Sequence, residues 1–63
     1  MEREKLAKLL EHWINHDREH TAKYEEWAVK MKDTEPNISE GLFEAVTHFR
    51  QGETALEKVR EML

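Results

Sequence analysis

Apolar residues recur at intervals of three and four positions in both halves of the chain. In the first half they are Leu6, Leu9 and Leu10, Trp13, Trp27 and Met31, with Ile14 and Tyr24 beside them. In the second half they are Leu42, Val46, Phe49, Leu56, Val59 and Leu63, with Phe43 and Met62 beside them. This spacing is typical of one face of an α-helix. It predicts one helix over about residues 2–32 and a second over about 38–62.

The segment between these two patterns contains the only proline of the chain, Pro36. A proline disfavours helical geometry in the residue before it, here Glu35. We therefore expect a loop over about 33–37, with Asn37 and Glu40 forming a capping box or Ser39 acting as the cap instead. Two helices of similar length joined by a short loop pack antiparallel, so the predicted fold class is all-α, an antiparallel two-helix hairpin.

Gly52 falls inside the second predicted helix. A glycine in a helix interior costs about 1 kcal/mol relative to alanine, and Thr54 with Glu57 could cap a new helix after it. The apolar period passes through Gly52 without a change of phase. We therefore expect one helix that is either continuous or kinked at this residue.

A lone hairpin has a single buried seam, and the chain carries more large apolar side chains than one seam can cover. Six of them are Trp13, Ile14, Tyr24, Trp27, Phe43 and Phe49. Burying a large side chain contributes roughly 1.5–3 kcal/mol, so leaving several exposed is unfavourable. The sequence thus predicts a homodimer in which two hairpins form a four-helix bundle.

Composition and charge exclude several classes of function. The chain has 63 residues, no cysteine, 10 Lys and Arg against 14 Asp and Glu, and a net charge of -4. No thiolate metal site or disulfide can form, and no basic stripe suits a nucleic acid. No apolar run approaches the roughly 20 residues of a membrane span. We expect a cytoplasmic protein that binds neither nucleic acid nor membrane.

Three histidines, His12, His16 and His20, follow one another at intervals of four in the first predicted helix. Side chains four positions apart lie on one helical face, so neighbouring pairs can reach a single ion. By the phase of the apolar pattern, His16 and His20 continue the predicted seam and should point inward, whereas His12 lies at its edge.

In the antiparallel hairpin, His48 should lie near the level of Tyr24, and Glu44 lies four residues before it. A metal site is then conceivable from His16 and His20 first, His48 second, and His12 and Glu44 last. Three imidazoles with one further ligand, either the carboxylate of Glu44 or a group from the second subunit, would suit a divalent transition metal such as Zn, Ni, Co or Fe. The alternative is structural: histidines on a helix seam often only pack, with their nitrogens satisfied by nearby polar groups.

Residues 16–20 also match H-x-x-E-H, a zinc-peptidase pattern, but such enzymes need a further ligand and a substrate cleft. No serine or cysteine nucleophile is paired with a base. We therefore expect no enzymatic activity, and the main hypothesis is an oligomerisation or protein-interaction module. A metal carrier or sensor is the alternative, and an enzyme would need a pocket at the dimer interface.

The stretch from His12 to His20, with Tyr24 and Trp27 behind it, resembles a small helical domain of uncharacterised archaeal and bacterial proteins. The motif of that domain is H-W-x-x-H-N-x-x-H followed by aromatic residues. This chain has Asp17 at the asparagine position. The resemblance covers about a third of the chain and implies a helical hairpin, without implying a reaction.

Overall fold

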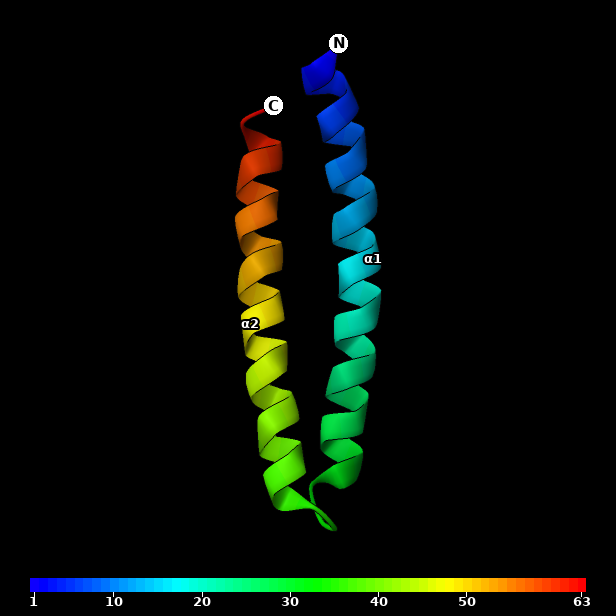
Figure 1. The fold of residues 1–63 in the computed structure, drawn as a ribbon, viewed down its shortest axis with the longest axis vertical. Helices are drawn as coiled ribbons and strands as arrows, with labels where there is room; N and C mark the ends of the chain where they lie inside the picture. Colours follow the sequence, from blue (N-terminus) through cyan, green and yellow to red (C-terminus); the bar gives the residue numbers. More distant parts are fainter.

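The computed structural model describes all 63 residues and consists of two antiparallel helices (Figure 1). Helix α1 spans Glu2–Met31 and helix α2 spans Pro36–Glu61. The two termini lie at the same end of a rod that measures 51 × 15 × 11 Å. The predicted all-α hairpin is therefore confirmed. Neither helix contains an apolar stretch long enough to cross a membrane.

Helix α2 begins at Pro36, two residues earlier than expected. Proline suits the first helical position because the N–H that it lacks would have no partner there. The expected capping box does not form: Glu35 is the N-cap residue, and no side chain caps the helix. Ser39 is buried instead, and its hydroxyl donates a 2.6 Å hydrogen bond to the carbonyl oxygen of Ala28. This bond ties the start of α2 to the end of α1.

Helix α2 runs without a break through Gly52. A β-carbon built at Gly52 would meet no atom within 4 Å, so no neighbouring group of the hairpin requires a glycine there. Of the two alternatives at this residue, the structure shows the continuous helix.

The seam between the helices is formed by seven buried residues at intervals of four or seven within each helix. They are Leu10, Ile14, Thr21 and Ala28 from α1, and Ser39, Val46 and Glu53 from α2. Intervals that add up to seven keep one line of side chains facing a partner helix, as in coiled coils. The apolar members lie toward the two ends of the hairpin, and the polar pair Thr21 and Glu53 lies between them.

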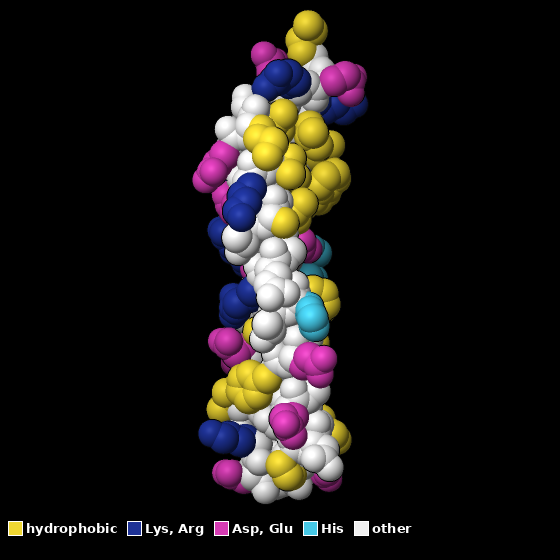
Figure 2. All heavy atoms as spheres, turned by 90° about the vertical axis from the view of Figure 1, so that its left-hand side faces the viewer, with side chains coloured by type: hydrophobic (Ala, Val, Ile, Leu, Met, Phe, Trp, Pro, Cys, Tyr) yellow, Lys and Arg dark blue, Asp and Glu magenta, His cyan; other side chains and the backbone are white.

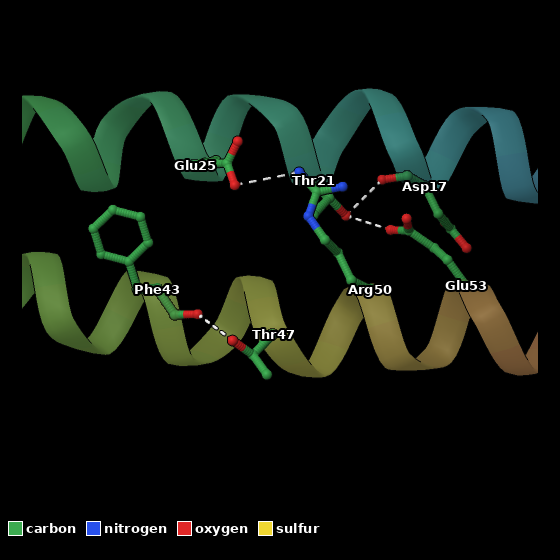
Figure 3. A network of polar contacts seen from close by, with 7 residues as sticks. All are labelled: Asp17, Thr21, Glu25, Phe43, Thr47, Arg50 and Glu53. Atoms are coloured by element: carbon green, nitrogen blue, oxygen red, sulfur yellow. Dashed lines mark hydrogen bonds and ion pairs between the residues drawn. The ribbon is translucent and has the colours of Figure 1, made fainter.

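Thr21 and Glu53 form a buried polar layer in the middle of the seam (Figure 3). The Thr21 hydroxyl oxygen lies 2.6 Å from Oε2 of Glu53 and 2.8 Å from the carbonyl oxygen of Asp17. Because a hydroxyl carries one proton, it can donate to only one of these oxygens at a time. A slip of one helix along the other would separate Thr21 from Glu53, so this layer favours the observed register.

The predicted phase of the seam was wrong. Leu6, Leu9, Trp13 and Trp27 were expected between the helices, but all four are exposed. Of the pattern predicted for α1 only Leu10 is buried; the seam continues at Ile14, which was expected beside the pattern, and then through small or polar residues. Because Thr21 and Ala28 carry little apolar surface, the larger residues on the neighbouring stripe dominated the pattern.

One edge of the seam is lined by ion pairs. Arg18 of α1 lies 3.1 Å from Glu57 of α2, and Arg50 of α2 lies 3.4 Å from Glu25 of α1 (Figure 3 shows the second pair). All four side chains are partly exposed. Such pairs contribute little stability, but their alternating charges follow the antiparallel orientation. This side of the hairpin is called the ionic face below.

Candidate assembly face and histidine row

The side opposite the ionic face is called the apolar face. Its exposed large side chains are Leu6, Leu9, Trp13, Tyr24 and Trp27 from α1, and Ile38, Phe49, Val59 and Leu63 from α2. Figure 2 shows α2 from its outer side: in the upper half hydrophobic side chains gather toward one edge with Lys and Arg side chains mostly along the other, whereas in the lower half hydrophobic side chains lie on both edges. The two long sides of the hairpin are therefore chemically different.

The helical period places these residues on one side of the molecule. Trp13 and Trp27 each precede a buried seam residue, Ile14 and Ala28, so they lie about 100° from it around the helix. The contact between the rings of Tyr24 and Phe49, with centroids 5.4 Å apart, shows that this side of α1 meets the same side of α2.

The exposed surface is large for a chain of this mass. The hairpin exposes 5198 Å² for 7.6 kDa, whereas size scaling gives about 4300 Å² for a compact protein of that mass. The excess of about 900 Å² is close to the roughly 800 Å² that each partner buries in a standard protein interface. Much of the area that a compact protein would bury is therefore still exposed.

The row of His12, His16 and His20 lies on exposed helix surface, not in the seam, which corrects the expected inward orientation of His16 and His20. The ring centroids of His16 and His20 are 4.6 Å apart and nearly perpendicular, at 81°. Those of His12 and His16 are 6.0 Å apart and nearly parallel, at 19°. His20 also stacks with Tyr24 at 6.2 Å, which joins the row to the apolar face.

His48 and Glu44 form a separate pair on α2. Nε2 of His48 lies 3.9 Å from Oε1 of Glu44, and both side chains are largely exposed. Within one chain, no three side chains of the metal-binding types come together around a common point. The structure thus brings His16 and His20 together, keeps His12 beside them, and leaves His48 and Glu44 as a pair of their own.

The imidazoles of His12, His16 and His20 make no hydrogen bond and no ion pair with the rest of the chain. The side-chain hydrogen bonds of the hairpin use other residues, and the one contact between a histidine and a carboxylate is that of His48. The depressions on the surface are open, and none is lined by a histidine. The nitrogens of the row are therefore free to bind a group from outside the chain.

Comparison with known proteins places the chain in a family. It belongs to the family described as "Domain of unknown function (DUF8180)", whose profile matches residues 6–63. It is 42% identical over 60 residues to an "Uncharacterized protein" of the archaeon Archaeoglobus fulgidus, and the match covers 95% of this chain and 97% of the relative. No solved structure matches. An archaeal relative is consistent with the resemblance described above. That the family shares the histidine motif stays a prediction.

Proposed function

We propose that this protein is an assembly module whose apolar face pairs with the same face of a second copy to form a four-helix bundle. The observation that carries the proposal is the apolar face itself, which exposes two tryptophans and seven other large side chains on one side of the hairpin. Within one hairpin, only Leu10, Ile14, Ala28 and Val46 form the buried apolar core. Such a small core is marginal for a chain of this length.

A second copy suits this face because both ends of it are apolar. Leu6, Leu9 and Trp13 lie toward the termini, and Trp27 and Ile38 lie toward the connection. A two-fold axis across the middle of the hairpin would lay each apolar end on the other end of the second copy. A two-fold axis parallel to the hairpin would lay each apolar end on the same end of the second copy. Both arrangements bury the apolar face and leave the ionic face in water.

The test uses two substitutions that differ in the face they change. Trp27 is 53% exposed on the apolar face, and Val29, two residues later, is 60% exposed on the ionic side of α1. Trp27→Glu and Val29→Glu add the same charge at similar exposure in the same helix. Sedimentation equilibrium of both variants and the parent, with circular dichroism to confirm helix content, compares their masses.

We expect the parent and Val29→Glu to be dimers and Trp27→Glu to dissociate at the same concentration. A buried carboxylate without a partner is costly in an interface, whereas one on a solvated face is not. A monomeric parent, or equal masses for the two variants, would contradict the proposal. If the parent is monomeric and instead forms a complex with a different protein, the second copy is the wrong occupant.

A further inference from the structure

We propose that His16 and His20 form half of an intersubunit site for a divalent transition-metal ion of the Zn²⁺ type, which the same two residues of a second copy complete. This inference rests on the proposed dimer, because a single hairpin supplies only two of the donors. The proposed ion would lie near the middle of the rod, at the apolar face.

The spacing and the geometry of the two rings suit a shared ion. Histidines at positions i and i+4 of a helix lie on one face and chelate Zn²⁺ in known helical motifs. Here the two ring centroids are 4.6 Å apart, closer than the 6.0 Å between His12 and His16. His16 and His20 are thus the pair in the row that is best placed to bind one ion together.

The imidazole nitrogens of His16 and His20 have no partner in the hairpin. In the proposed dimer they would move from water into an interface, where a polar group without a hydrogen bond or a ligand is costly. A bound cation would satisfy one nitrogen of each of the four rings. The other nitrogen, which carries the proton of a neutral imidazole, would remain available for water or a hydrogen-bond acceptor.

The position of the pair along the rod explains why the second copy would complete the site. Helix α1 spans Glu2–Met31, so its midpoint falls between His16 and Asp17. Residue 18 lies midway between His16 and His20 along α1. A two-fold axis that crosses the apolar face at the level of residue 18 would place His16 opposite His20 of the second copy. Four imidazoles would then surround one point, which is the number of ligands in a structural zinc site.

Gly52 lies close to His20 on the neighbouring helix. The contact between Thr21 and Glu53 sets the level of the two antiparallel helices, so Gly52, which precedes Glu53, lies level with Ala22, two residues along α1 from His20. A β-carbon at Gly52 would meet no atom of the hairpin within 4 Å. The helix beside His20 thus presents its smallest residue near that imidazole.

The experiment titrates Zn²⁺ into tag-free protein that was purified without chelator, follows heat by calorimetry, and measures the mass of the same samples by sedimentation. The variants are His16→Ala and His20→Ala, with His48→Ala as the matched control because His48 lies on α2 beside Glu44. All three side chains are exposed in the hairpin, so circular dichroism should show unchanged helix content.

We expect a dimeric parent that binds one Zn²⁺ per two chains. Each of His16→Ala and His20→Ala should weaken binding by more than about 100-fold, since loss of a group that only orients a ligand already costs about 10–100-fold. His48→Ala should bind as the parent does. Affinity should also fall in acid, because a protonated imidazole cannot ligate.

Other results would overturn the metal site in distinguishable ways. A dimeric parent without stoichiometric Zn²⁺ would reject the site and leave the proposed assembly standing. A monomeric parent that binds one Zn²⁺ per chain would reject the shared site and the assembly together. Equal weakening in His48→Ala and His16→Ala would show that zinc binds histidines without selection among them.

Discussion

The buried contact between Thr21 and Glu53 gives the sharpest prediction about stability. Thr21 is 1% exposed and Glu53 is 5% exposed, and their oxygens lie 2.6 Å apart. The substitution Thr21→Val keeps the shape of the side chain and removes the hydroxyl. It leaves the buried carboxyl group of Glu53 without its partner, and an unsatisfied buried polar group costs about 1–3 kcal/mol, or more when it is charged.

This cost is large against the total stability of the chain. At about 0.05–0.15 kcal/mol per residue, 63 residues give a free energy of unfolding of about 3–9 kcal/mol. For a domain of this size, a loss of 1 kcal/mol lowers Tm by roughly 4–8 °C. We therefore expect Thr21→Val to lower Tm by at least about 4 °C.

The reverse change, Glu53→Leu, should cost less. The Thr21 hydroxyl keeps an acceptor, the carbonyl oxygen of Asp17 at 2.8 Å, and the added leucine brings apolar surface into the seam. In the double variant both polar partners are gone, and replacing both with apolar groups of similar shape can be nearly neutral. The double variant should thus be more stable than Thr21→Val alone.

The assay is urea unfolding followed by circular dichroism for the parent, both single variants and the double variant at one protein concentration. Equal concentration matters because dimer formation would add to the measured stability. The reasoning is refuted if Thr21→Val lies within about 0.5 kcal/mol of the parent, the usual range for surface substitutions. It is also refuted if the two single effects add within about 0.3–0.5 kcal/mol, as they do for independent sites.

Two further predictions address the seam and the connection side of α2. Ile14→Ala should lower the free energy of unfolding by about 2–5 kcal/mol, because Ile14 is fully buried. Urea unfolding measures this free energy, and a loss below about 1 kcal/mol would contradict the position of Ile14 in the seam. Gly41→Ala should raise the free energy of unfolding by about 0.8–1 kcal/mol, because alanine favours a helix more than glycine does and the added β-carbon meets no atom within 4 Å. A lower Tm for this variant would contradict the prediction.

The sequence predicted the two helices and their hairpin because the signals for both are local. A period of three and four residues marks each helix, and Pro36 marks the turn between them. The exact start of α2 was missed because Pro36 was read as part of the loop, although proline is also favoured at the first helical position.

The side of α1 that faces α2 was not predicted correctly because the helix has two adjacent apolar stripes. The stripe with Trp13 and Trp27 carries more apolar area, so a prediction based on side-chain size places that stripe in the seam. The stripe with Ile14, Thr21 and Ala28 packs against α2, because small residues and one matched polar pair let the helices approach closely. The seven-residue interval from Ile14 to Thr21 and then Ala28 is the signal that could have identified it.

The spacing of His16 and His20 was readable from the sequence, whereas their surroundings were not. Whether a histidine lies in the seam or beside it depends on a shift of one or two residues in helical phase. The expected neighbourhood with His48 depended on that phase, and the structure instead places His48 with Glu44.

Sedimentation equilibrium of the unmodified chain over a range of concentrations shows whether two apolar faces pair. We expect a mass of twice 7.6 kDa that decreases toward 7.6 kDa only on dilution. A mass of 7.6 kDa at every concentration up to the millimolar range would show that the apolar face stays open to water and would contradict the proposed assembly.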